Sequence, residues 1–283
     1  MKLIKSIQEM RSWTLKQKQL GKTIGFVPTM GFLHQGHLSL VKKARLQNDA
    51  VVLSIFVNPM QFGPKEDFSV YPRDLEKDSL LAAGAGVDLI FYPDISEIYP
   101  QYPPLTSVEV QGITEELCGK SRPGHFTGVA TIVTKLLNIV QPQSAYFGQK
   151  DYQQYLVIRQ LANDLNMPIS IEMAPIVREE DGLAMSSRNA YLSPVEREEA
   201  LALNQALEIC HRLYLSGEDR IIPLVEAIRT RLLQVPSLKI DYIEIRGAAD
   251  LGQLTVIDVS AVVAIAAYIG KTRLIDNLLL EVD

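Results

Sequence analysis

The sequence predicts an α/β protein in which a doubly wound parallel sheet is followed by a second, smaller α+β domain. Three observations favour this fold class. Short apolar runs alternate with amphipathic segments as far as about residue 177, which is typical of strands joined by crossover helices. The run 50–57 (AVVLSIFV) is apolar almost throughout, as expected for a parallel strand covered on both faces. After residue 180 the alternation ends, and helices are followed by strands.

The first domain is expected to span residues 1–179. After MKLIKS, the chain runs straight into a helical pattern. Apolar runs of strand length then lie at 23–27, 50–57, 87–92, 144–147 and 169–177. Segments with the 3.6-residue period of a helix separate them, at 37–47, 72–83, 126–140 and 152–166,. Ligands of such a sheet should bind at the carboxyl ends of the strands.

The second domain is expected to span residues 180–283. It begins with a helix start, in which Ser193 is the N-cap, Pro194 the first helical residue and Glu196 the third residue after the cap,. Helices are expected at 194–216 and 222–233, and strands at 240–245, 255–259 and 262–269. The longest irregular stretch, 93–104, is rich in proline and tyrosine.

Composition narrows the class of function. The 283 residues carry a formal net charge of -5, which argues against nucleic acid or an anionic membrane as the main partner. Cys118 and Cys210 match no metal or redox spacing, so free thiols in a reducing compartment are expected,. The N-terminus lacks an apolar signal segment, and the longest uncharged apolar run, 259–270, is too short to span a bilayer,. A cytoplasmic protein with a small polar substrate is predicted.

Two histidines mark the first candidate site. In PTMGFLHQGHL (28–38), His34 and His37 stand where a strand gives way to a helix, beside Gly31 and Gly36. Glycine lets a ligand approach the backbone closely, and the amides of a helix N-terminus bind anions. Imidazole can donate to phosphate oxygens and add positive character there. A metal site would need a third ligand at recognisable spacing, and an incidental pair at a helix start is the remaining alternative.

Two further segments could contact phosphate. In GQKDYQQ (148–154), Lys150 follows a strand and precedes a helix, which suits a phosphate contact but also a solvated turn,. In GLAMSSRN (182–189), a glycine, two hydroxyls and Arg188 lie near the expected domain junction. That loop could close over a triphosphate or simply cap a helix.

Two polar loops could bind a small acid. Asn58 and Gln61 in NPMQFG (58–63) offer amides that donate and accept, although Asn-Pro and Phe-Gly are also ordinary turn sequences,. Arg122 and His125 in SRPGHF (121–126) could pair with a carboxylate or cap the following helix.

The order of these motifs carries a resemblance. HQGH after a strand resembles the HIGH-type signature of the nucleotidyltransferase superfamily, and MSSR (185–188) resembles a variant of the KMSKS loop. PTMGFLHQGH, SIFVNPMQFG, YPRD, RPGHF, FGQKDYQQ and DGLAMSSRN together resemble the pantothenate synthetase family, the pantoate–β-alanine ligases, in order from about residue 24 to 192. The resemblance implies a Rossmann-like domain over 1–179 that binds ATP and pantoate, a lid domain over 180–283, and a homodimer.

The resemblance also assigns residues. It implies that ATP lies along Met30, Gly31, Phe32, Leu33, His34, Gln35, Gly36, His37, Gly148, Gln149, Lys150, Asp151, Val177, Met185, Ser186, Ser187 and Arg188. His37 matches the acid catalyst, and His34, Lys150, Ser186 and Arg188 are the other donors expected to act in catalysis. Gln61 and Gln154 match the residues that hold pantoate, with Gln61 also meeting β-alanine, while Asn58, Arg122 and His125 are expected nearby.

The implied reaction is the ATP-dependent condensation of (R)-pantoate with β-alanine to pantothenate. A carboxylate acylates poorly, so a pantoyl adenylate is expected, with release of pyrophosphate and then AMP. Mg²⁺ is expected mainly on the triphosphate, without an all-protein metal site. Two alternatives stay open: another adenylyl or cytidylyl transferase of the same fold, or a catalytically silent nucleotide sensor.

Overall fold

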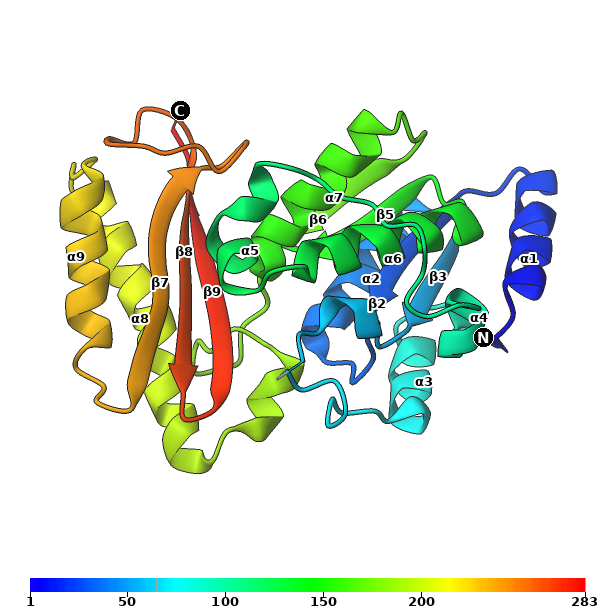
Figure 1. Ribbon diagram of the computed structural model, residues 1–283, viewed down its shortest axis with the longest axis horizontal. Coiled ribbons are helices and arrows are strands. Elements are labelled where there is room, and N and C mark those ends of the chain that lie inside the picture. The colour runs from blue at the N-terminus through cyan, green and yellow to red at the C-terminus, as the bar shows by residue number, and fades with distance from the viewer. Residues whose placement is uncertain (65, 283) are drawn as a thin grey trace.

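The computed structural model describes residues 1–64 and 66–282. Two sheets lie side by side, with the small one beside α8 and α9 at the left of Figure 1. The large sheet consists of β1 (Lys2–Ile4), β2 (Ile24–Thr29), β3 (Ala50–Ile55), β4 (Leu89–Phe91), β5 (Ser144–Gly148) and β6 (Ser170–Ala174). The small sheet consists of β7 (Leu238–Gly247), β8 (Ala261–Ile269) and β9 (Thr272–Leu280).

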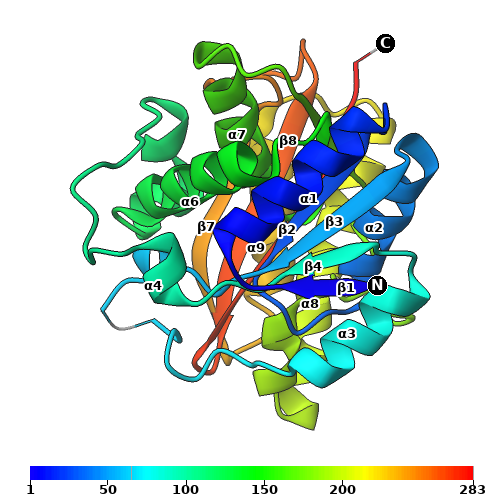
Figure 2. The ribbon, with the colours of Figure 1, turned by 90° about the vertical axis from the view of Figure 1, so that its right-hand side faces the viewer.

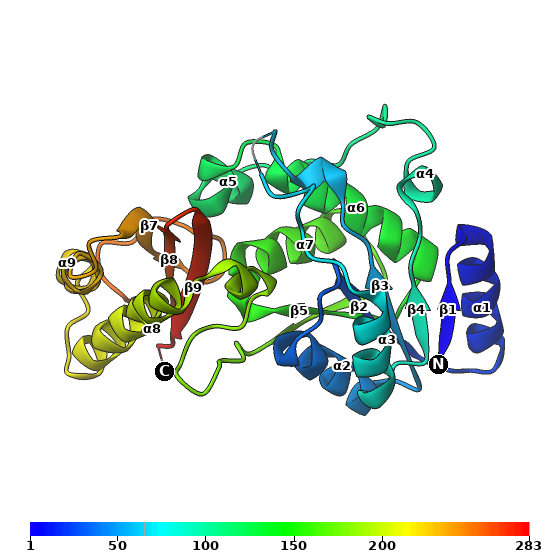
Figure 3. The same cartoon turned by 90° about the horizontal axis from the view of Figure 1, so that it is seen from below.

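The large sheet is parallel at every pairing, in the order β1-β4-β3-β2-β5-β6. The helices that go with it are α1 (Ile7–Gln19), α2 (Gln35–Gln47), α3 (Leu75–Gly84), α4 (Ile95–Ile98), α5 (Leu117–Ser121), α6 (His125–Val140) and α7 (Tyr152–Asp164). Figures 2 and 3 show α6 and α7 on one side of the sheet and α2 and α3 on the other. The α/β doubly wound prediction is confirmed.

Alternate residues of the central strands serve the two faces of this sheet. Phe26 and Val52 pack with α1, α6 and α7 on one face. Their neighbours Val27 and Val51 pack with α2 on the other. Because both faces are covered, the strands are apolar at successive positions, which is the pattern that predicted them.

The small sheet is antiparallel and uses both of its faces. One face packs on α8 (Pro194–Leu215) and α9 (Ile221–Leu232). The other brings Val262 and Ala264 of β8 against Tyr152 and Leu156 of α7. The expected capping box of α8 is present, since the Glu196 amide donates to the Ser193 hydroxyl at 3.3 Å and the Ser193 amide to the Glu196 carboxylate at 2.9 Å.

Several elements differ from expectation, among them α4, a short helix within the stretch 93–104 that was expected to be irregular. The segment 255–259 is not a strand; it makes only an isolated bridge between Val256 and Arg220. β9 is a full strand that periodicity did not reveal, and β1 is a three-residue edge strand within MKLIKS, ahead of the expected helix. No helix in the described part of the chain is long and apolar enough to cross a membrane.

Candidate active site

The strand order reverses between β2 and β5. From β2 the chain passes outward to β3 and β4, and α6 then returns it to β5 on the other side of β2. Loops that leave such a reversal in opposite directions open a crevice at the carboxyl ends of the strands. The histidine pair follows β2 and Lys150 follows β5, so the two segments converge there.

The two histidines form the cap of α2. The His34 Nδ1 accepts from the Gly36 amide at 3.2 Å, and the His37 Nδ1 accepts from the His34 amide at 3.3 Å. The ring centroids lie 4.1 Å apart. Because each Nδ1 is an acceptor, the neutral ring carries its proton on Nε2 and can donate from that atom.

Both rings resist protonation. Burial, reinforced by the charge of Lys150, lowers the pKa of His34 to about 4. Burial, His34 and Lys150 together hold the pKa of His37 well below its usual range. The rings are therefore neutral hydrogen-bond donors at neutral pH, and the positive character expected from the sequence comes from Lys150 instead.

The backbone before the histidines is held by a residue that sequence reasoning missed. Gly31 has φ of +85° and Phe32 has φ of +53°. The Asp78 carboxylate accepts from the Phe32 amide at 2.8 Å and from the Leu33 amide at 2.7 Å. Asp78 is only 1% exposed, so these two bonds stabilise an otherwise unfavourable turn,. The chain gave no local signal of this, because Asp78 reads as a polar position on a helix.

Arg188 is already paired in this structure. Its Nε and Nη2 donate to the two oxygens of Asp67 at 3.0 and 2.9 Å. Ser186 caps the turn that carries it, accepting from the Arg188 amide at 3.3 Å, and the Ser187 hydroxyl donates to the Phe32 carbonyl at 3.4 Å. The MSSR segment thus lies directly against the histidine loop.

Gln61 lies at the centre of a hydrogen-bond network. Its Nε2 donates to the Met30 sulfur at 3.2 Å, and its Oε1 accepts from the Asn58 amide at 3.1 Å. Asn58 is 1% exposed, and its amide also donates to the Gly128 carbonyl. Asn58 therefore orients Gln61 from behind, a role that its turn sequence does not reveal.

Arg122 and His125 contact the same glutamine through its backbone. Arg122 donates to both oxygens of Glu66, at 2.7 and 2.6 Å. Its Nη1 lies 3.0 Å from the His125 Nε2, so that nitrogen accepts and the Nδ1 donates to the Gln61 carbonyl at 2.8 Å,. The carboxylate partner expected for Arg122 is thus supplied by the protein itself.

One cavity of about 230 Å³ brings most of the candidate residues together. It is lined by the candidates Met30, His34, Gly36, His37, Asn58, Gln61, Arg122, His125, Gly148, Lys150, Asp151, Gln154, Val177, Met185, Ser186, Ser187 and Arg188. Gly31, Phe32, Leu33, Gln35 and Gln149 do not line it. Leu33 belongs to the core and Gln35 is exposed.

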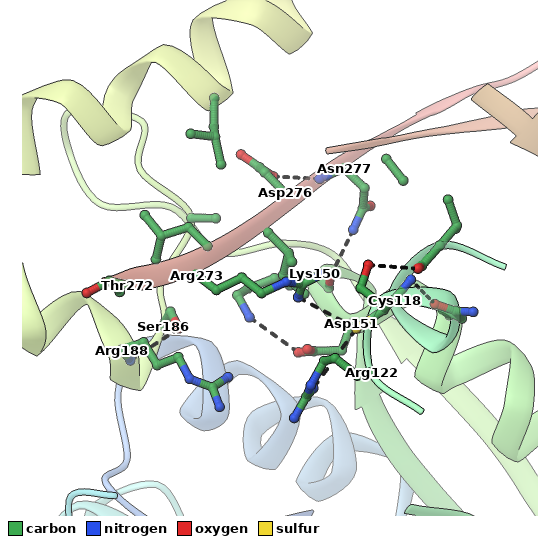
Figure 4. Close-up of a pocket in the computed structure, with 18 of the residues that line it drawn as sticks. Cys118, Arg122, Lys150, Asp151, Ser186, Arg188, Thr272, Arg273, Asp276 and Asn277 are labelled. Atoms are coloured by element: carbon green, nitrogen blue, oxygen red, sulfur yellow. Dashed lines mark hydrogen bonds and ion pairs between the residues drawn. The ribbon is translucent and has the colours of Figure 1, made fainter. Parts of the chain in front are cut away.

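A second cavity, of about 470 Å³, adjoins the first and shares Arg122, Lys150 and Arg188 with it. Figure 4 shows this cavity, with Thr272, Asp276 and Asn277 of β9 along the strand that crosses the view and Lys150, Cys118 and Arg122 below it. Among residues 1–64 and 66–282, no three His, Cys, Asp or Glu side chains gather as a metal cluster. The two cavities form a cleft that is large enough for a nucleotide and a small acid.

Comparison with known proteins identifies the family. The model of the pantoate-beta-alanine ligase family matches residues 2–279. The chain belongs to the pantoate–beta-alanine ligase family. It is 53% identical to pantothenate synthetase of Thermotoga neapolitana over 281 residues, which is 99% of this chain and 100% of that protein.

Solved structures of the family agree in fold. The pantothenate synthetase of Thermus thermophilus is 46% identical, with a TM-score of 0.94 over 98% of this chain and 99% of that one. The pantoate-beta-alanine ligase of Francisella tularensis, complexed with Beta-gamma ATP and beta-alanine, is 39% identical, with a TM-score of 0.79 over 99% and 97%. The small sheet and its helices therefore belong to the shared fold.

Proposed function

We propose that this chain condenses (R)-pantoate with β-alanine at the expense of ATP, through a pantoyl adenylate. The observation that supports the proposal best is the single cavity onto which the histidine pair, Lys150, the MSSR segment and the Gln61 network open. Its residues combine donors for phosphate with amides for a hydroxy acid. Membership in the ligase family gives the substrates, and the Francisella complex supports ATP and β-alanine among them.

In the first step a pantoate carboxylate oxygen attacks the α-phosphorus of ATP, and the bond to pyrophosphate breaks. Negative charge grows on the phosphate oxygens. The Nε2 protons of His34 and His37 and the ammonium of Lys150 are placed to donate to them without prior reorganisation. A neutral imidazole can fill this role, because its Nε2–H donates a hydrogen bond without prior protonation of the ring.

In the second step the neutral amine of β-alanine attacks the acyl carbon, and AMP leaves. The amine proton passes to water. Gln61 and Gln154 are proposed to hold the hydroxyl and carboxylate groups of pantoate, with Gln61 fixed by Asn58 and by His125. Because Gln61 is oriented by contacts that already exist, its amide does not have to be ordered when the substrate binds.

Mg²⁺ is proposed to bind mainly to the triphosphate, where it would neutralise charge. The described residues fit this better than a resident ion, since Asp151 is the carboxylate beside Lys150 and stands without a cluster of ligands around it,. We also infer a cytoplasmic homodimer whose partners are small molecules, and neither nucleic acid nor a membrane. Residues 180–283 are proposed to act as a lid on the nucleotide domain, residues 1–179.

The deciding measurement is AMP release by purified protein supplied with ATP, Mg²⁺, pantoate and β-alanine. AMP and pantothenate should appear in equal amounts. Another adenylyl or cytidylyl transferase of this fold would release pyrophosphate without forming the amide. A nucleotide sensor would bind ATP and leave it intact, and either result would refute the proposal.

A further inference from the structure

The buried side-chain amide of Asn277, in the small sheet, binds the turn that carries Lys150. The Asn277 side chain, in β9, donates to the carbonyls of Gln149 and Lys150, each at 2.9 Å. Its Oδ1 accepts from the Gln149 side chain at 3.3 Å. Asn277 is 4% exposed. Figure 4 shows it on β9, directly beside Lys150.

Both side-chain amide protons of Asn277 are therefore used on one turn. A buried polar group is expensive unless its partners are in place, and here donors and acceptor are all satisfied by residues 149 and 150. These partners lie more than 120 residues away from Asn277 in the sequence. Packing of the small sheet does not by itself call for an amide at this position, because Ile275 and Leu279, the residues two positions away on the same face of β9, are apolar,.

Asp276, which precedes Asn277 in β9, contacts the loop that follows β6. Asp276, 3% exposed, accepts from Arg178 at 2.7 and 3.0 Å. Arg178 directly follows Val177, a candidate ATP contact. The backbone amide of Asn277 in turn donates to the Asp276 carboxylate at 2.8 Å. Two successive polar residues of one strand thus contact the loops that follow β5 and β6.

We propose that Asn277 is a positioning residue for Lys150. By holding the carbonyls of the turn Gln149–Asp151, it sets the direction in which the lysine leaves the backbone and so the place of its ammonium in the cleft. The inference rests on the proposed function, because it gives Lys150 a phosphate to meet. It also makes the small sheet part of the nucleotide site, so that any lid motion must carry Lys150 with it or break these bonds.

The test is the isosteric change Asn277→Asp. A carboxylate cannot donate, and it would face two carbonyl oxygens. We expect single-turnover adenylation to slow about 30-fold, since misplacing a catalytic group by about 1 Å can cost about 10²-fold. The Kd for ATP should change by less than about threefold, because a displaced ammonium weakens the contacts made in the transition state more than those made to bound ATP.

The same change in a Lys150→Ala background separates positioning from general damage. With no lysine to place, Asn277→Asp should slow adenylation further by less than about threefold, as expected when two residues act as one unit. Asn138→Asp is the matched control, because Asn138 is an exposed asparagine of α6 that also donates to a carbonyl, at 2.9 Å. It should leave adenylation unchanged.

Several results would overturn the inference. One is adenylation at the parental rate in Asn277→Asp. Another is an equal fold loss of adenylation when Asn277→Asp is introduced into the parent and into Lys150→Ala. If a thermal melt shows that Asn277→Asp is unfolded, Asn277→Ala replaces it; if neither folds, Asn277 is a structural residue only. Hydrogen exchange over residues 144–152 should rise in the variant, and unchanged exchange also counts against the inference. A parent that releases no AMP refutes the proposed function instead, and the exchange result still decides the role of Asn277.

Discussion

Acid should destabilise this protein through His125. The ring accepts from Arg122 through Nε2 and donates to the Gln61 carbonyl through Nδ1, so a second proton has no acceptor and meets a guanidinium. Burial and the Arg122 charge lower the pKa of His125 from 6.5 to about 4. The folded state therefore does not bind the proton that the unfolded chain binds below about pH 6.5. The free energy of unfolding has its full value above that pH and decreases as the pH falls toward 4,.

The size of the effect follows from the two pKa values. At about pH 5 the unfolded ring is almost fully protonated and the folded one hardly at all, which corresponds to about 2 kcal/mol of lost stability. This is an upper value, because the ring is partly exposed and solvent screens it,. His125→Asn keeps a side-chain N–H near the position of Nδ1 and removes the titration. The variant should lose about 2 kcal/mol less than the parent between about pH 7 and about pH 5.

Urea unfolding at the two pH values measures the difference directly. His34 and His37 act in the same direction in both proteins and cancel in the comparison. His211→Asn is the matched control, because His211 is exposed on α8, and it should show the full parental acid loss. An equal acid loss in parent and His125→Asn would refute the reasoning.

Three further predictions concern the reaction. Lys150→Ala and His37→Ala should stay folded in a thermal melt, although His37→Ala loses one bond of the α2 cap, bind ATP within about tenfold of the parent, and lose single-turnover adenylation by about 10² or more; near-parental adenylation would make the residue a bystander. Gln154→Ala should discriminate less than the parent between pantoate and a deoxy analogue, because a site that hydrogen-bonds a hydroxyl rejects the analogue that lacks it; equal discrimination would remove Gln154 from substrate recognition. Pantoate alone should support exchange of labelled pyrophosphate into ATP, and a strict requirement for β-alanine would contradict a free-standing adenylate.

The parallel sheet could be predicted because its signal is local. Strands buried on both faces are apolar at every position, and the crossover helices are amphipathic. β9 was missed because Asp276 and Asn277 interrupt its apolar pattern, and both contact loops of the large sheet. The segment 255–259 shows the opposite error, because a strand was predicted there and the structure has only an isolated bridge. Its β-branched residues suggest a strand, but strand propensity depends on an available neighbour, and Val256 finds only Arg220.

The candidate site likewise contains residues that the sequence could reveal and residues that it could not. His34, Lys150 and Arg188 could be found because they lie in short motifs next to element boundaries. Asp78 could not, because its partners are 45 and 46 residues away and nothing in its own helix indicates them. Pairing at long sequence distance is a property of the fold, and a single sequence shows it only where composition is unusual.

Glu66 and Asp67 show how such hidden pairs shape the cleft. In sequence they are two acids in a polar loop, yet each holds a different arginine. The Arg122 side chain is 13% exposed and also contacts His125 and the Gln61 carbonyl, so releasing it would disturb three contacts. The Arg188 side chain is 30% exposed and its guanidinium is bound to Asp67.

If Arg188 meets the triphosphate as the resemblance implies, its Nε and Nη2 can exchange the Asp67 carboxylate for phosphate oxygens, or they can keep Asp67 while Nη1 donates to phosphate,. Both are anions that accept bidentate hydrogen bonds from guanidinium, so the exchange keeps the charge-assisted bonds while changing the partner. The cost of the exchange is the Asp67 carboxylate that is left behind, to which Tyr191 also donates at 3.4 Å. The Gln61 amide is thus already held by protein contacts, whereas a bidentate contact of Arg188 with phosphate through Nε and Nη2 would require Asp67 to be displaced.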